Sequence, residues 1–152
     1  MSRQPQNVLV LPFRVKEEAE YAMFKRTDMK IWQFVAGGVE GDETVLNGAK
    51  RETFEEAGIP VISKFYKLDS HFTVTADNFP KLWKSNKYSL YVVPVYCFAV
   101  ECSGTEIIIS DEHTDFCWGN FEKCNEMLYF SNDKTALWEL DQRIKDNTLI
   151  SI

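Results

Sequence analysis

The segment from residue 37 to residue 59, GGVEGDETVLNGAKRETFEEAGI, limits the folds open to this chain more than any other part of the sequence. Between Asp42 and Ala57 its small and apolar side chains recur at helical spacing and form one stripe, which consists of Leu46, Ala49, Thr53 and Ala57. Gly58 follows at the position where helices commonly end in a left-handed glycine. The segment therefore predicts a loop, a helix and a second loop.

Three acids crowd the end of this predicted helix. On a helical wheel, Glu56 and Glu55 lie about 40° and 60° to either side of Glu52, so all three share one face. Like charges one turn apart repel, and acids in the last turn oppose the helix dipole. A divalent cation reverses both effects, because Mg²⁺ is commonly held by one or two carboxylates together with substrate phosphates. The alternative for an isolated acidic run is a solvated helix face.

Length and charge restrict the class of protein. The 152 residues are 45% hydrophobic, which suits one domain with a substantial core. The formal net charge of -6 argues against a nucleic acid polymer as partner, so a polyphosphate substrate would need a cation as intermediary. The apolar run VLVLPF is too short to cross a bilayer, and no leader pattern precedes it, so we expect a cytoplasmic protein without a membrane partner. The four cysteines lack metal-binding spacing and are expected to be buried free thiols.

The remaining sequence alternates between strand and helix patterns. Strands are expected at residues 7–15, 19–26, 31–35, 61–68, 88–100 and 106–110. Pro94 implies an edge or a bulge in the fifth of these strands, and residues 70–87 are predicted to be a long loop. A helix is expected from Asp133 to Lys145, capped by Ser131 or Asn132. This order predicts an α/β fold, a mixed sheet covered by helices.

The acidic segment also fits a longer pattern, Gx5Ex7REUxEExGU, in which U is a bulky aliphatic residue. The positions in register are Gly37, Glu43, Arg51, Glu52, Glu55, Glu56, Gly58 and Ile59. This spacing resembles the Nudix hydrolase family. One position departs, since Thr53 stands where an aliphatic residue is usual, and we expect its hydroxyl to bond back to the carbonyl of residue 49.

Further stretches resemble the branch of the family that cleaves dihydroneopterin triphosphate and dATP. They are WQFVAGGVEGDE, SDEHTDFCW and SNDKTALWEL. The resemblance implies that residues 1–152 form a single domain with the Nudix fold, an α/β/α sandwich with a mixed β-sheet and a catalytic loop-helix-loop. It implies Mg²⁺-dependent hydrolysis of a phosphoanhydride bond in a nucleoside or pterin triphosphate, with release of pyrophosphate, and Mn²⁺ as a substitute cation.

Roles for the acidic residues follow from the same resemblance. Glu52 and Glu56 would ligate the metal, and Glu55 would serve as a ligand or as the group that orients or deprotonates water. Arg51 would hold Glu55 in place, and Glu43 would be structural in the first helical turn. From outside the segment, Glu112 is the candidate for an additional ligand, with Asp111 and Asp115 as rivals. A plain surface acid remains the alternative for Glu112.

Substrate contacts are expected from both sides of the segment. Gly37 and Gly38 would let the backbone approach phosphate oxygens. Of the neighbouring Lys25 and Arg26, which point to opposite faces of a strand, Arg26 is preferred because its planar fork suits phosphate. Trp32 would stack on a flat heterocycle or, alternatively, be a half-buried core residue. His113 is a substrate contact or a structural histidine, and Trp83 is a candidate lid residue.

Two other functions remain open on the sequence. The same catalytic segment would serve an enzyme acting on a diphosphate linked to another leaving group, such as ADP-ribose or a dinucleoside polyphosphate. A non-catalytic module that senses a nucleotide is the other, although such a protein would be expected to lose acidic ligands that this chain keeps. A homodimer is compatible with either.

Overall fold

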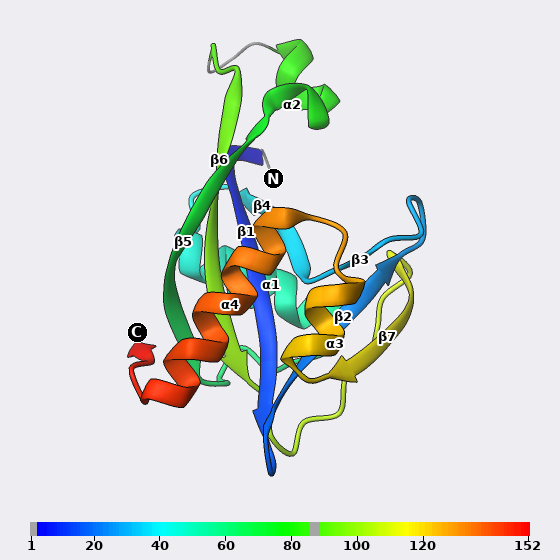
Figure 1. Ribbon diagram of the computed structural model, residues 1–152. Helices are drawn as coiled ribbons and strands as arrows, with labels where there is room; N and C mark the ends of the chain where they lie inside the picture. The colour runs from blue at the N-terminus through cyan, green and yellow to red at the C-terminus, as the bar shows by residue number, and fades with distance from the viewer. Residues whose placement is uncertain (1–2, 86–88) are drawn as a thin grey trace.

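Strand β1, Arg3–Val15, forms the centre of the fold because its apolar run is buried on both faces. Leu9, Leu11 and Phe13 point into one core cluster, which also contains buried residues of helix α4, Ser131–Asp146. Val8 and Val10 point to the other side and join a second cluster with helix α1, Val45–Ala57. The computed structural model describes residues 3–85 and 89–152, and Figure 1 shows α4 and α1 on opposite faces of the sheet.

The other strands extend the sheet in both directions from β1. They are β2 (Ala19–Arg26), β3 (Trp32–Gln33), β4 (Val35–Glu40), β5 (Phe65–Thr75), β6 (Val92–Glu101), β7 (His113–Gly119) and β8 (Ile150–Ser151). The order is β3-β2-β1-β6-β5-β8, with β4 paired to β1 and β7 paired to β2. β1 and β6 run parallel, whereas the neighbouring pairs are antiparallel. The predicted mixed sheet with helices on both faces is confirmed.

Helix α1 has a defined cap at each end. Thr44 is its N-cap and accepts a hydrogen bond of 3.1 Å from the backbone N–H of Asn47. Gly58 ends it with a φ of 70°, in the left-handed region, and its N–H donates to the carbonyl of Phe54. The predicted glycine stop is confirmed. The helix starts at Val45, three residues after the predicted start, so Glu43 precedes it and does not lie in its first turn.

Helix α4 starts earlier than predicted and with a different cap. Its N-cap residue is Phe130, so the predicted caps Ser131 and Asn132 lie inside the helix. Leu137 and Leu140 of this helix are buried against the sheet core. The first turn of α4 is instead fixed by a contact outside the helix, because the buried carboxylate of Asp133 accepts a hydrogen bond from the N–H of Phe34.

Residues 70–87 were wrongly expected to be a loop. Strand β5 runs on to Thr75 and is followed by the 3-10 helix η1 (Ala76–Asn78) and helix α2 (Pro80–Ser85). Residues 86–88, which end the predicted loop and begin the predicted strand 88–100, lie outside the described residues. β5 also starts at Phe65, because residues 61–63 form a turn. We call residues 72–85 and 89–94, the projecting end of β5 and β6 with η1 and α2, the arm (Figure 1).

Pro94 lies where β6 has a partner on one side. It pairs with Thr73 of β5, whereas the pairing of β6 with β1 starts at Val95, opposite Asn7. The predicted edge position of Pro94 is therefore local to the arm, because β6 becomes an interior strand from Val95 onward.

The expected strand at residues 106–110 is absent from the described fold. Ile108 and Ser110 instead donate their N–H groups to the carbonyls of Ala57 and Glu56 at the end of α1. Ile107 is buried, but Ile108 is 67% exposed. The segment is thus an extended connection that hydrogen-bonds to the end of α1 and leads into β7.

Helix α3, Phe121–Met127, and strand β7 are elements that periodicity did not reveal. The four cysteines are free thiols, and Cys97, Cys102 and Cys124 are buried, as expected. Across residues 3–85 and 89–152, none of the helices is long and apolar enough to cross a membrane.

Candidate active site

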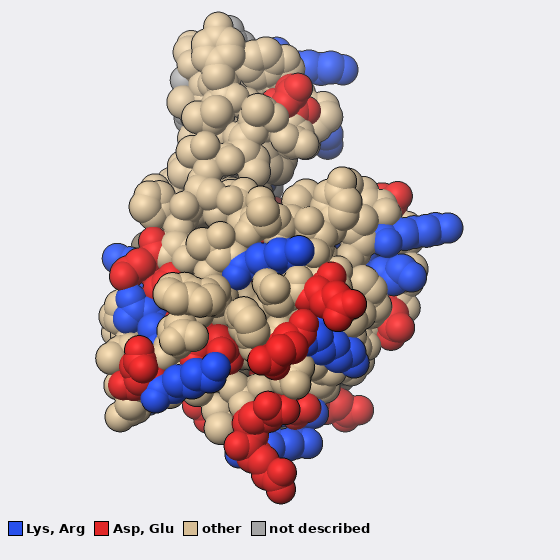
Figure 2. All heavy atoms as spheres, in the orientation of Figure 1, with Lys and Arg blue, Asp and Glu red and all other residues tan. Residues whose placement is uncertain are grey.

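A cleft of about 930 Å³ lies between the arm and the body of the sheet. Figure 2 shows the arm overhanging a recess in the surface. Phe72, Val74 and Phe79 of the arm line one side. Glu52 and Glu56 of α1 lie at one end, and Asp133 of α4 also belongs to the lining. A cleft of this size is typical of a small-molecule site, and its lining mixes apolar side chains with many polar and charged ones.

Glu52, Glu56 and Glu112 converge in this cleft. Helix α1 supplies the first two from successive turns, and the turn before β7 supplies Glu112. Burial raises the pKa of Glu56 to about 10, with further contributions from a hydrogen bond to Glu112 and from the charge of Glu52. Burial also raises the pKa of Glu52 to about 7, although Arg51 opposes this rise. The carboxylates thus repel one another in a poorly hydrated place.

His113 is packed against this cluster. Its Nε2 lies 3.8 Å from Oε1 of Glu56, and burial lowers its pKa, which favours the neutral ring. The ring is 5% exposed and lies 5.3 Å from the ring of Phe24, centroid to centroid. Both alternatives for His113 therefore apply in part, because it lines the cleft yet is held as a core residue.

Arg51 organises the acidic residues from beside the cleft. Its guanidinium donates to Glu43 at 2.7 Å, to Glu52 at 3.0 Å and to Glu55 at 3.2 Å. It also donates to the carbonyl of Gly38 at 2.7 Å. The predicted contact with Glu55 is present, but Glu43 is the main partner. Glu43 accepts the N–H of Glu40 as well, and so joins the loop before α1 to the helix.

The glycine pair of β4 makes room for two side chains. A Cβ on Gly37 would lie 2.1 Å from Cδ of Glu52, and one on Gly38 would lie 1.5 Å from Nη1 of Arg3. Both glycines line the cleft, as expected. Because the two glycines have no side chains, Glu52 and Arg3 can approach the strand. This role of the glycines differs from the close approach to phosphate that the sequence suggested.

Several predicted residues lie outside the cleft. The side chain of Glu55 is 54% exposed, whereas Glu56, one residue further along α1, is buried. Trp32 packs partly buried against the core and pairs with Leu128, which agrees with the alternative of a core residue. Further predicted residues also lie outside the cleft lining, namely Lys25, Glu43, Arg51, Gly58, Trp83, Asp111 and Asp115. Trp83 instead packs against Tyr91 within the arm.

Arg26 lines the cleft, and Lys25 does not, which agrees with the preference for arginine. Its guanidinium is engaged by Asp28 in a two-point contact, with distances of 2.9 Å and 2.6 Å. The lining also contains polar residues that the sequence did not single out, among them Arg3, Asn7, Gln33 and Asp133. Nothing local marks Arg3 or Asp133, although Gln33 stands next to the tryptophan of the quoted WQFVAGGVEGDE stretch.

The acidic cluster suits a divalent cation. Oε2 of Glu56 is buried and has no hydrogen-bond partner within the described part of the chain. Carboxylate oxygens are the ligands of hard cations, and positive charge would relieve the repulsion among the three acids. Among residues 3–85 and 89–152, no three acidic, histidine or cysteine side chains form a finished metal cage. Mg²⁺ is usually bound by one or two carboxylates, with water and substrate phosphates as its other ligands. The residues therefore fit a Mg²⁺ site to which the protein and the substrate both supply ligands.

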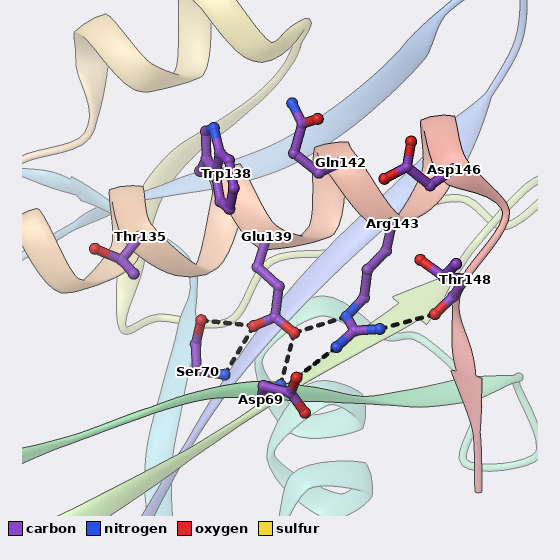
Figure 3. Close-up of a pocket in the computed structure, with 9 residues that line it drawn as sticks. All are labelled: Asp69, Ser70, Thr135, Trp138, Glu139, Gln142, Arg143, Asp146 and Thr148. Atoms are coloured by element: carbon purple, nitrogen blue, oxygen red, sulfur yellow. Dashed lines mark hydrogen bonds and ion pairs between the residues drawn. The ribbon is translucent and has the colours of Figure 1, made fainter.

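A second, shallower hollow lies over α4 and β5, and its polar groups are satisfied among themselves. Figure 3 shows Glu139 accepting from the backbone N–H groups of Asp69 and Ser70. Arg143 joins Glu139, Asp69 and the carbonyl of Thr148. The pairing of β5 with β6 shifts register between Lys67 and His71, so this network holds an irregular stretch of strand. The hollow is structural.

Known proteins resemble the whole of this arrangement. A NUDIX domain model matches residues 3–138. The dihydroneopterin triphosphate diphosphatase of Haemophilus influenzae is 27% identical over 133 residues, covering 87% of this chain and 84% of that protein. A NUDIX hydrolase structure from Listeria monocytogenes has a TM-score of 0.89 at 38% identity, covering 98% of this chain and 100% of that one. The dihydroneopterin triphosphate pyrophosphohydrolase of E. coli shares the fold, with a TM-score of 0.75 at 20% identity and coverage of 94% and 99%.

Proposed function

The chain belongs to the NUDIX family and is a Nudix pyrophosphohydrolase, and we propose that it cleaves a phosphoanhydride bond in a nucleoside or pterin triphosphate, releasing pyrophosphate. One observation carries the proposal, the convergence of Glu52, Glu56 and Glu112 at one end of a cleft of about 930 Å³. The relative from Haemophilus influenzae, a dihydroneopterin triphosphate diphosphatase, supports the triphosphate class. We further propose that residues 1–152 form one Nudix domain.

Glu52 and Glu56, with Glu112, would hold Mg²⁺, or Mn²⁺ in its place. When bound, the cation supplies Lewis-acid charge to the phosphoryl oxygens and makes water a stronger nucleophile. Arg51 keeps the carboxylate of Glu52 oriented through its 3.0 Å contact. Glu112 is better placed than Glu55 to accept the proton of the attacking water, because Glu112 lines the cleft and Glu55 does not.

The heterocycle would bind toward the arm. Phe72, Val74 and Phe79 of the arm offer an apolar wall in the same cleft as the acids. Aromatic rings suit flat bases and pterins, because every such ring has a π-face. This placement replaces the stacking role that the sequence suggested for Trp32.

A substrate panel with and without Mg²⁺ tests the proposal. The panel contains dihydroneopterin triphosphate, dATP, ADP-ribose and a dinucleoside tetraphosphate, and chromatography separates pyrophosphate, phosphate and monophosphates. We expect pyrophosphate from the triphosphates with Mg²⁺, none with EDTA, and a loss of several orders of magnitude in kcat for Glu56→Gln. Preferred cleavage of ADP-ribose or the dinucleotide would assign the substrate class to the alternative. Saturable binding without any product would identify a nucleotide sensor.

A further inference from the structure

Among the arginines of the candidate active site, Arg3 is the one whose donors are least used. Arg26 faces the carboxylate of Asp28 at two points, and Arg51 is surrounded by three glutamates and a carbonyl. Arg3 donates to the neutral side-chain carbonyl of Asn7. Its Nε is buried and has no partner among the described residues. An unpaired buried donor on a cation is unfavourable unless an anion completes it.

Two neighbouring side chains, Phe79 and Asn7, hold the guanidinium of Arg3 in place. The group lies over the ring of Phe79 in the arm, with Cζ 4.2 Å from the ring centroid. A stacked guanidinium uses its face for the ring and keeps its N–H groups in the plane, where they can bind two oxygens of one phosphate. The hydrogen bond to Asn7 fixes the orientation of the guanidinium within its own plane.

The position of Arg3 is next to the acidic cluster. The guanidinium interacts with the charges of Glu52 and Glu40 and lies against Gly38, where a Cβ would overlap Nη1. Arg3, Glu52 and Phe79 all line the same cleft. Arg3 therefore stands between the acidic end of the cleft and the apolar wall of the arm, on the path that a polyphosphate chain would follow.

We propose that Arg3 binds a phosphate of the substrate directly, with Phe79 and Asn7 as the residues that position it, and that the arm is thereby coupled to occupation of the site. This inference rests on the proposed function for the identity of the anion. The ligand class is a diphosphate or triphosphate group, whatever heterocycle it carries. Arg3 thus takes the role that the sequence suggested for Arg26.

Equilibrium binding of inorganic pyrophosphate in the presence of Mg²⁺, followed by calorimetry, tests the inference without turnover. Arg3→Ala should weaken the Kd by about 10- to 100-fold, which corresponds to a charge-assisted hydrogen bond. Arg3→Lys keeps the charge and should recover part of the affinity, whereas Arg3→Gln, which keeps polarity alone, should remain weak. Phe79→Leu should weaken binding less than Arg3→Ala, because it removes the support and leaves the donor.

Arg14→Ala is the matched control. Arg14 also lies over an aromatic ring, Trp118, at 4.1 Å and pairs with Glu20 at 2.9 Å, but it does not line the cleft. Its Kd for pyrophosphate should stay within about twofold of the wild type. Equal affinity for Arg3→Ala and wild type would overturn the inference while leaving hydrolysis intact. Failure of the wild type to hydrolyse any substrate, with the expected order of Arg3 variants in pyrophosphate binding, would overturn the proposed function alone.

Discussion

Glu43, just before helix α1, and Arg51, two turns into it, form the ion pair that joins the loop to the helix. Oε1 of Glu43 lies 2.7 Å from Nη2 and 3.2 Å from Nε of Arg51. The hydrogen bond from Arg51 lowers the pKa of Glu43, although burial opposes this shift. Because Arg51 also contacts Glu52, the pair sets the position of a carboxylate in the cleft.

Arg51→Lys should lower both stability and activity. Lysine cannot reproduce the planar fork that reaches Glu43, Glu52 and the carbonyl of Gly38 together, so we expect a loss of about 1–3 kcal/mol in the free energy of unfolding. Urea unfolding and kcat/KM measure the two effects. Arg143→Lys is the control, since Arg143 has a similar network in the hollow over α4 and should lose stability alone. Full activity in Arg51→Lys would contradict an orienting role.

Mg²⁺ should raise the melting temperature of the wild type. The ion would relieve repulsion among buried carboxylates, and ligands that bind only the folded state stabilise it. Glu52→Gln and Glu56→Gln should show a smaller shift between EDTA and Mg²⁺ than the wild type. Without metal, Glu56→Gln should melt higher than the wild type, because the amide cannot carry the negative charge that burial and the neighbouring Glu112 and Glu52 disfavour at this position. Thermal melts in both buffers measure these effects.

Glu55→Gln provides the neighbouring control for the metal effect. Glu55 is 54% exposed and does not line the cleft, so its amide variant should keep the full shift with Mg²⁺. A loss of the shift in Glu55→Gln equal to that in Glu56→Gln would show that the acids of α1 act together, as the helical wheel alone suggested.

Local patterns predicted the parts of the fold that depend on neighbours in sequence. The stripe of α1 and its glycine stop were recognised because caps and helical spacing are properties of a few consecutive residues. The hydroxyl of Thr53 bonds back to the carbonyl of Ala49 at 2.7 Å, as expected from residues one turn apart. Residues 106–110 were wrongly expected to form a strand, because three isoleucines favour strands, while the carbonyls that bind this segment belong to α1.

Apart from Glu112 and Arg26, which the family resemblance indicated, the site was predictable only where one segment supplies it. Glu52 and Glu56 stand one turn apart, so their convergence followed from the helix. Arg3 is brought to Phe79, 76 positions away, by the pairing of β1 with β6 and by the arm, and no local signal marks such a contact. Asp133 is similarly brought to Phe34 by the packing of α4 on the sheet. These contacts depend on the tertiary structure, so the charge and spacing of residues in the sequence do not predict them.

Gly37→Ala should impair activity more than stability. Its Cβ would lie 2.1 Å from Cδ of Glu52, and the flexible end of that side chain can move away at modest cost, taking the carboxylate out of position. Gly104→Ala is the converse control, because Gly104 has a φ of 78° and nothing near its Cβ position. It should lose about 1 kcal/mol of stability and no activity. Urea unfolding with steady-state kinetics separates the two, and normal kcat in Gly37→Ala would contradict this role of the glycine.

Thr53→Val should be nearly neutral. Thr53 is fully buried, and its hydroxyl is satisfied by a carbonyl that the helix already uses. Valine keeps the branched shape and removes a polar group, so the free energy of unfolding should change by less than about 1 kcal/mol, with kcat unchanged. Thr53→Ser, which keeps the hydroxyl and loses the methyl, should be less stable than Thr53→Val. The reverse order in urea unfolding would mean that the hydroxyl does more than bond back to its own helix.

Asp133→Asn should change how stability depends on pH. Burial raises the pKa of Asp133 to about 7, although a hydrogen bond from Phe34 opposes the rise. Between the unfolded pKa of 3.8 and about 7, the folded state holds the proton and the unfolded state does not. The free energy of unfolding therefore falls as pH rises through this window, by up to about 1.4 kcal/mol per pH unit for one group.

Asparagine retains an oxygen for the N–H of Phe34 but does not titrate, so Asp133→Asn removes this slope. Its stability relative to the wild type should rise from about pH 4 to about pH 7 and then level off. Urea unfolding in EDTA at four pH values across this window measures the difference. Glu139→Gln is the control of opposite sign, because although burial raises the pKa of Glu139, its hydrogen bonds, that from Ser70 first among them, lower it overall. That variant should lose stability relative to the wild type as the pH rises toward the unfolded pKa of 4.5, and above 4.5 the deficit should stay constant. A stability difference that rises above pH 4.5 in parallel with that of Asp133→Asn would contradict the assignment.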